Sequence, residues 1–303
     1  MRHVPVLLKE VLESLRLRSR MDVVDCTIGD AGHAEAILAK TVPDGRLLAI
    51  DADPESLLRA KKNLYSAGNR VTFVRDNFVE LKKIIEREKF GPVSAILIDL
   101  GWSSPQFAER GRGFSFEKDE SLDMRYGGEP QGEYATAADV LNKGAEEELE
   151  KIFREYGEER LSREIAKGVV DARKQQSIER TNQFIEIILD VDRKKLKTTK
   201  DIPWVGGLHP ATKVFQALRI AVNNELGVIE QVLPQAVDVL APGGRLAVIT
   251  FHSLEDRIVK HWFKSIEKKS IHLVNRKAIV CSPEEAEINP RARSAKLRVV
   301  EKI

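Results

Sequence analysis

A carboxylate, a glycine and two hydroxyls follow an apolar run just before residue 100. Residues 95–98 read Ala-Ile-Leu-Ile, and the stretch 99–106 that follows reads Asp-Leu-Gly-Trp-Ser-Ser-Pro-Gln. An unbroken apolar run of this length predicts a strand buried on both faces of a parallel sheet. Ligands of such sheets bind beyond the carboxyl ends of the strands. Asp99, Ser103 and Ser104 are therefore candidate catalytic residues.

A glycine-containing loop joins the first predicted strand, 23–25, to a helix that begins near His33. The loop residues 29–32 read Gly-Asp-Ala-Gly, a layout that brings backbone amides and a helix N-terminus to a ligand. The third glycine of the dinucleotide fingerprint is missing, and short glycine loops after strands are often only turns. Asp51 favours the ligand interpretation, because an acid about 20 positions on, at the end of the next strand, can accept both hydroxyls of a ribose.

Polar residues also follow the third predicted strand, 71–74. Asp76-Asn77-Phe78 suits an adenine pocket, with a polar group for the exocyclic amine and an aromatic ring beside the base. Asp99 would then meet the charged amino-acid end of the cofactor. Four polar strand ends without a complete pyrophosphate loop favour S-adenosylmethionine over NAD. An NAD-dependent oxidoreductase is the enzymatic alternative.

The order of these elements predicts the fold. Apolar strands at 23–25, 47–50, 71–74 and 95–98 alternate with helices, which implies a doubly wound α/β sheet with right-handed crossovers. Helical periodicity then replaces the alternation, so we expect a mainly helical insertion over 108–208. The sheet domain would comprise 1–107 and 209–303, with a helix over 211–232 and strands at 245–250 and 297–300.

Composition limits the class of protein. The 303 residues are 42% hydrophobic and 32% charged, with a formal net charge of +2, as in ordinary globular proteins. Cys26 and Cys281 cannot form a disulfide framework, which favours a reducing cytoplasm. No apolar run predicts a membrane span or a signal peptide.

The chain resembles the bacterial 16S rRNA cytosine-N4 methyltransferase family, which methylates a cytosine in the decoding region of the small ribosomal subunit. The resemblance extends over the whole chain, and long motifs carry it. These motifs are His3–Leu8, Gly29–His33, Asp51–Asp53, Asp99–Gln106, Arg112–Phe116, Leu122–Arg125, Phe215–Ile220 with Val222-Asn223, Phe251–Arg257 and Asn289–Ser294.

The resemblance implies a Rossmann-like class I methyltransferase sheet, with an inserted helical domain that recognises the RNA. It implies that S-adenosylmethionine is the cofactor, bound by the glycine loop and by polar residues at the strand ends. The expected cofactor-binding residues are Gly29, Ala31, Gly32, His33, Asp51, Phe78, Asp99 and Gln106. The implied substrate is 16S rRNA, within the small subunit or a late assembly intermediate, and the target base has to leave its stack to react.

The sequence departs from the family pattern at two places. The family usually has glycine where Asp30 or Ala31 stands, and a small branched residue where Trp102 stands. The methyl group of Ala31 should still allow close backbone approach. An indole at position 102 would either crowd the pocket or stack on the base.

His252 follows the predicted strand 245–250 and precedes Ser253, Glu255 and Asp256. Two interpretations are open, a packed histidine at a strand end or a wall of the active site, and the resemblance favours the second. Glu255 and Asp256 also fit the acidic first turn of a helix. A metal site is not expected, because the six histidines are scattered and none shows ligand spacing.

Two basic clusters are the remaining candidates for an RNA contact. One lies in the insertion and the other near the C-terminus, and either is a solvated face or binds phosphates. They comprise Arg193, Lys194, Lys195, Lys197 and Lys200, and Arg291, Arg293, Lys296 and Arg298. A non-catalytic ribosome-assembly factor is the alternative from another class of protein, and the polar strand ends argue against it.

Overall fold

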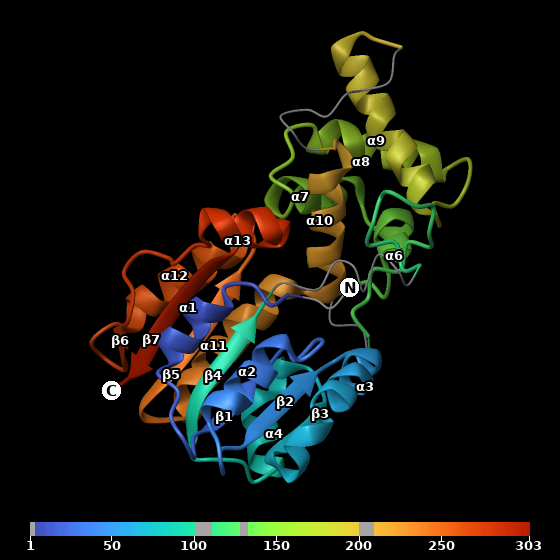
Figure 1. Ribbon diagram of the computed structural model, residues 1–303. Coiled ribbons are helices and arrows are strands. Elements are labelled where there is room, and N and C mark those ends of the chain that lie inside the picture. The colour runs from blue at the N-terminus through green and yellow to red at the C-terminus, as the bar shows by residue number, and fades with distance from the viewer. Residues whose placement is uncertain (1–3, 101–110, 128–132, 200–208) are drawn as a thin grey trace. The chain divides into compact units, whose positions relative to one another are not determined.

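The structure is a computed structural model that describes residues 4–100, 111–127, 133–199 and 209–303 (Figure 1). The chain divides into two compact units, one formed by 1–102 with 226–303 and the other by 103–225. Along the described segments, no helix combines the length and the apolar character that a membrane crossing needs.

The first unit is built on a mixed sheet that has seven strands within the described residues, in the order β3-β2-β1-β4-β5-β7-β6. The first five positions are parallel, whereas β7 runs antiparallel to β5 and β6 runs antiparallel to β7. The predicted doubly wound sheet of the class I methyltransferase type is therefore confirmed. The strands are β1 Asp22–Asp25, β2 Leu47–Asp51, β3 Val71–Arg75, β4 Val93–Asp99, β5 Leu240–Thr250, β6 Ile271–Leu273 and β7 Lys296–Lys302.

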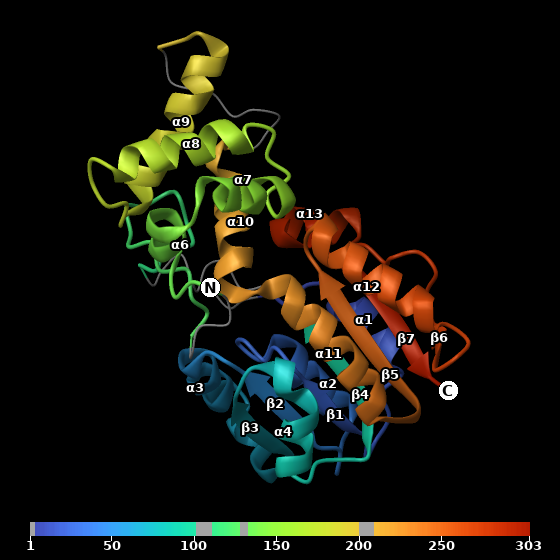
Figure 2. The same ribbon diagram turned by 180° about the vertical axis from the view of Figure 1, so that it is seen from behind.

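Helices cover both faces of this sheet (Figures 1 and 2). Side chains alternate along each strand, so Val24 and Leu48 enter one core while Val23 and Leu47 enter the other. Because both faces are buried, the central strands read as continuous apolar runs. One face is covered by α4 Leu81–Arg87, α11 Glu225–Val239 and α12 Ser253–Ile266, and the other by α1 Leu8–Leu15, α2 Gly32–Lys40 and α3 Pro54–Asn63.

The strand register brings three acids to the carboxyl edge of the sheet. Asp25, which ends β1, pairs with Ala49 of β2 and with Leu97 of β4. Asp51 and Asp99 each stand two residues further along their strands, one on either side of Asp25. The alternation of strands and helices thus assembles carboxylates that are far apart in the sequence.

The second unit is helical, and its own core is built around Phe153, Phe184 and Phe215. The Phe184 ring stacks on the Phe215 ring with centroids 5.7 Å apart and lies 6.0 Å from the Phe153 ring. The helices of this unit are α6 Ala137–Lys143, α7 Glu146–Glu155, α8 Ser162–Arg173, α9 Thr181–Leu196 and α10 Ala211–Asn223.

The prediction of a single helix over 211–232 is wrong, because the chain forms two helices that are separated at Asn224. Asn224 adopts the left-handed conformation with φ 46°. The Asn223 side chain, one residue earlier, accepts from the Tyr126 amide and donates to the Met124 carbonyl. The helix α10 packs with the insertion, so the second unit spans 103–225 rather than the expected 108–208.

Candidate active site at the carboxyl edge of the sheet

The loop between β1 and α2 has the conformation that close approach of a ligand to backbone requires. Ala31 is fully buried and left-handed, with φ 67°, and precedes the first residue of α2. A Cβ atom on Gly32 would lie 3.1 Å from the Pro5 ring, so only glycine fits there without displacing that ring. Gly29 also has a positive φ, of 49°. The backbone amides at this helix N-terminus form the kind of cradle predicted for a cofactor.

Asp51 is held in place by two backbone amides. Its carboxylate accepts from the Gly29 amide at 3.0 Å and from the Asp53 amide at 2.9 Å. Each oxygen keeps a second acceptor position, so the group can accept two further hydrogen bonds. Burial raises the pKa of Asp51 to about 6, although both amides act to lower it.

Asp25 is a buried acid of this edge that is absent from the sequence-based candidates. Its carboxylate accepts from the Thr27 amide at 3.0 Å, and the residue is 2% exposed. Burial raises its pKa to about 7, with a smaller contribution from the negative charge of Asp51. The signal that could have found it is its position at the end of the first strand, the same position that singles out Asp51 and Asp99.

His33 links the first turn of α2 to two other parts of the site. Its Nε2 donates to the Val6 carbonyl at 2.9 Å, because a carbonyl oxygen can only accept. Its Nδ1 lies 3.8 Å from the carboxylate of Asp99. The Asp99 amide in turn donates to the Thr27 hydroxyl at 2.9 Å, which fixes the end of β4 beside the loop.

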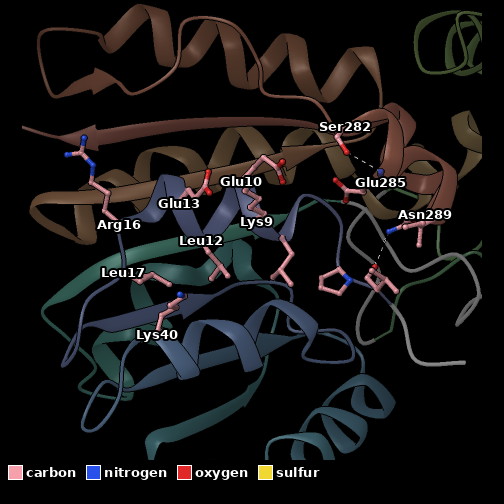
Figure 3. Close-up of a pocket in the computed structure, with 14 residues that line it drawn as sticks. Lys9, Glu10, Leu12, Glu13, Arg16, Leu17, Lys40, Ser282, Glu285 and Asn289 are labelled. Atoms are coloured by element: carbon pink, nitrogen blue, oxygen red, sulfur yellow. Dashed lines mark hydrogen bonds between the residues drawn. The ribbon is translucent and has the colours of Figure 1, made fainter.

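The segment before α1 is fastened by the segment α13 Pro283–Ile288 (Figure 3). The carboxylate of Glu285 accepts from the Leu7 amide at 2.7 Å, and the Asn289 amide group donates to the Val4 carbonyl at 3.1 Å. A groove of about 800 Å³ opens beside these contacts, between α1 and α13. The contacts keep Pro5 against Gly32, so they support the glycine loop from outside.

The residues expected to form an adenine pocket are partly engaged with their own backbone. Asn77 begins the short helix η2 Phe78–Glu80, and its side chain accepts from the Val79 amide at 3.0 Å. The carboxylate of Asp76 accepts from the Asn77 amide and contacts Arg87 at 3.0 Å. Phe78 is 9% exposed and packs in the core beneath. A contact between Phe78 and the base stays a prediction.

His252 begins α12 as its N-cap residue. Its Nδ1 accepts from the Glu255 amide at 3.5 Å, and the buried Glu255 carboxylate accepts from the Phe251 amide at 2.7 Å. Glu255 therefore serves the start of the helix, which is one of the roles expected for it. Asp256 forms a bidentate ion pair with Arg298, at 2.6 and 3.1 Å. A contact between His252 and the substrate stays a prediction.

Ser103, Ser104 and Gln106, together with Trp102, lie outside the described residues, so their predicted roles stay predictions. Parts of the two basic clusters are engaged inside the protein. Arg193 binds Glu186 and Asp190, at 3.2 and 2.7 Å.

Arg298 is likewise occupied by the Asp256 pair, and Arg293 donates to the carbonyl of Ala286. Burial lowers the pKa of Arg291, and the nearby Asp99 charge opposes that effect. Lys296 likewise lies 3.6 Å from the Asp256 carboxylate, and Lys200 lies outside the described residues. Lys194, Lys195 and Lys197 therefore remain the main candidates for a phosphate contact.

Comparison with known proteins identifies the family of this chain. The profile of the MraW methylase family matches residues 1–303. The ribosomal RNA small subunit methyltransferase H of Symbiobacterium thermophilum is 44% identical over 99% of this chain and 96% of its own length. The proteins of the same name from Heliobacterium mobile and Clostridioides difficile are 43% and 40% identical, over 99% of each chain. The resemblance drawn from the motifs is confirmed, and the chain belongs to the MraW methylase family.

Proposed function

We propose that the protein transfers a methyl group from S-adenosylmethionine to the exocyclic N4 amine of a cytosine in the decoding region of 16S rRNA. The observation that carries this proposal is the Asp51 carboxylate, buried at the end of β2 and held by the Gly29 amide. An acid in that position suits the two hydroxyls of a ribose. The names of the relatives, which are small-subunit rRNA methyltransferases, support the substrate class.

The residues present fit this cofactor. Ala31 turns the backbone toward the start of α2, so the amides of this helix N-terminus are available to the amino-acid end of the cofactor. Asp51 would hold the ribose, Phe78 the adenine ring, and Asp99 with the loop the amino-acid end. His33 is assigned to this group as well, and its bond to the Val6 carbonyl makes it a positioning residue for Asp99.

The main task of the protein in this reaction is to align the cytosine amine with the methyl group, rather than to activate either group. Bound S-adenosylmethionine supplies an electrophilic methyl group. The lone pair of the cytosine amine is delocalised into its ring, so the protein has to hold that nitrogen at near-attack distance and in line. Asp99, Ser103 and Ser104 would accept hydrogen bonds from the amine, and the Asp99 carboxylate, the only base among them, would receive the proton that the amine loses.

The helical second unit is the proposed RNA-recognition domain. Lys194, Lys195 and Lys197 at the end of α9 form no ion pair with any other described residue, unlike Arg193. Replacing these three lysines by glutamine should weaken RNA binding and flatten its salt dependence without a change in cofactor affinity. The proposed substrate is the small ribosomal subunit or a late assembly intermediate of it.

The function is tested by mapping modified nucleosides of 16S rRNA by mass spectrometry. Small subunits from cells that lack this protein would be incubated with the purified chain and S-adenosylmethionine. We expect one new N4-methylcytidine in the decoding region. A protein that binds the cofactor and the subunit but adds no methyl group would be an assembly factor, and 5-methylcytidine would show a different reaction.

A further inference from the structure

The exposed face of α12 carries a concentration of positive charge that the proposed site does not use. Between 257 and 277 the sequence has seven Lys or Arg residues and one acid, Glu267. The whole chain has a net charge of only +2, so this segment holds an unusual share of the positive charge. It is not among the basic clusters expected from the sequence, because apolar residues separate its cations.

Helix geometry gathers these cations on one side. Arg257, Lys260, His261 and Lys264 are spaced at i, i+3, i+4 and i+7, which places them on one face. All four are exposed except Lys260, which is half-buried, and the opposite face buries Val259 and Phe263 in the core beside the sheet. Lys268 and Lys269 extend the row into the turn before β6. We call these six residues the basic face of α12.

The acids of α12 do not neutralise this face. Glu255 and Asp256 are 2% and 9% exposed, since Glu255 caps the helix and Asp256 binds Arg298. Within the described part of the chain, no carboxylate lies within 4.0 Å of the ammonium groups of the four lysines of the basic face. By contrast, Lys82 and Lys83 of α4, a helix that packs on the same face of the sheet, both bind acids.

Helix stability does not account for the whole arrangement. Cations favour the last turn of a helix because of its dipole, and this can explain Lys264 and the turn residues. The effect fades within one turn, so it does not explain Lys260 in the middle of the helix. The like charges of the lysines on this face repel each other, and a bound polyanion would relieve that repulsion.

The basic face of α12 begins close to the proposed active site. α12 begins at Ser253, directly after His252 at the carboxyl end of β5, which is the edge that holds Asp51 and Asp99. The basic face therefore starts near the proposed site and extends away from it. From Arg257 to Lys264 it covers about 10 Å, at roughly 1.5 Å per residue, a length that spans more than one phosphate of an RNA strand.

We propose that the basic face of α12 binds the phosphate backbone of the RNA substrate, beside the nucleotide that reacts. This inference rests on the proposed function, since it takes RNA as the substrate. None of the exposed large apolar side chains of the described chain lies on α12, so the face offers nothing to insert into a lipid bilayer. Its chemistry is that of sequence-independent phosphate contacts.

The test is a triple variant, Lys260→Gln, Lys264→Gln and Lys268→Gln, compared with the parent on purified small ribosomal subunits. The matched control is Lys40→Gln, Lys62→Gln and Lys89→Gln, which removes the same charge from exposed lysines elsewhere on the first unit. We expect the slope of log affinity against log salt to fall by about 2 in the α12 variant alone. At moderate salt its affinity should drop at least about tenfold.

Kinetics and a conservative variant complete the test. The KM for the subunit should rise in the α12 variant while kcat stays unchanged, because the contacts hold the substrate equally before and during reaction. Arginine at the same three positions should restore binding. Equal salt slopes for the α12 variant and its control would overturn the inference. The inference would also be overturned if the α12 variant lost binding to phosphatidylserine vesicles but bound ribosomal subunits as well as the parent does. A parent protein that binds subunits in this way but does not methylate them would instead refute the proposed function.

Discussion

The carboxylate of Asp51 accepts a hydrogen bond from the Gly29 amide at 3.0 Å, which joins the end of β2 to the loop after β1. The two residues are 22 positions apart, and the parallel pairing of β1 with β2 brings them together. One acid thus orders the loop and keeps acceptor positions for a ligand. The glycine loop and the ribose acceptor form a single unit, so a change in one should affect the other.

The variant Asp51→Ala should lose about 100-fold in affinity for S-adenosylmethionine, a few kcal/mol, because two charge-assisted hydrogen bonds disappear. Titration calorimetry measures this, and circular dichroism verifies the fold. The matched control is Asp30→Ala in the same loop, whose carboxylate binds Arg59 at 2.7 Å. Unchanged affinity in folded Asp51→Ala would remove this residue from the site.

Cofactor affinity should fall at acidic pH. Burial raises the pKa of Asp51 to about 6, and the ionised form accepts both hydroxyls of a ribose. Affinity should therefore be full above about pH 7 and decline by up to tenfold per unit below about pH 6, as the carboxylate takes up a proton. Calorimetry across this range measures the effect. Asp51→Asn should bind weakly and show no such decline; a flat profile for the parent would contradict the assignment.

Much of this edge could be predicted from the sequence, because the strands that form it are short apolar runs ended by acids. Position alone singles out Asp51 and Asp99, and the structure brings both to one edge. Asp25 obeys the same rule, but a single acid at the end of a three-residue run is a weak signal by itself. The pattern also could not show that its carboxylate is buried almost completely, since burial depends on elements that come later in the chain.

The break between α10 and α11 shows a second limit of sequence patterns. Phe215, Leu218 and Val222 form one apolar stripe with Leu226 and Ile229, and periodicity alone predicts a single helix. In the structure, the first three pack in the insertion and the last two against the sheet. A stripe shows that a face is buried, but it does not show in which core. His252 is another residue whose role the sequence pattern does not show, because only the fold identifies it as a helix cap.

Replacing Asp25 by asparagine should stabilise the protein at alkaline pH. Burial raises the pKa of Asp25 to about 7, above the usual value of 3.8, so the folded state holds a proton that the unfolded state releases between these values. The destabilising effect of Asp25 is therefore absent below about pH 4, grows as the pH rises toward about 7, and stays constant above that.

The variant Asp25→Asn keeps an acceptor for the Thr27 amide without the buried charge. Its free energy of unfolding should exceed that of the parent by a few kcal/mol at about pH 8, and the gap should narrow toward about pH 5 and close below about pH 4. Denaturant unfolding at both values measures the difference. A gap that does not depend on pH would show that the Asp25 carboxylate titrates normally.

The contact between Glu285 and the Leu7 amide should protect that amide from solvent exchange. Glu285→Ala removes its acceptor, so hydrogen exchange at Leu7 should become at least about tenfold faster. Cofactor affinity should fall modestly, because Pro5 would no longer be held in contact with Gly32 of the glycine loop. The control is Glu287→Ala on the exposed side of the same short helix. Equal exchange rates in the two variants would show that the N-terminal segment is held by other contacts.

The two cysteines distinguish amine methylation from methylation of the ring carbon C5. A C5 reaction needs a thiolate that adds to C6 of the cytosine, so a reactive cysteine has to reach the base. Cys26 is 1% exposed, and burial raises its pKa well above the usual value, so its thiol stays protonated. Cys281 packs against the core on the α1 face of the sheet, in the segment before α13.

The variant with both Cys26→Ser and Cys281→Ser should therefore keep most of its methyl-transfer activity on small subunits. Any loss should follow weaker cofactor binding, because the hydroxyl introduced by Cys26→Ser would lie in an apolar environment next to the glycine loop. Activity is measured by methyl incorporation at saturating cofactor, and affinity by calorimetry. A covalent complex between protein and RNA, or complete loss of turnover at normal cofactor affinity, would exclude direct transfer to N4.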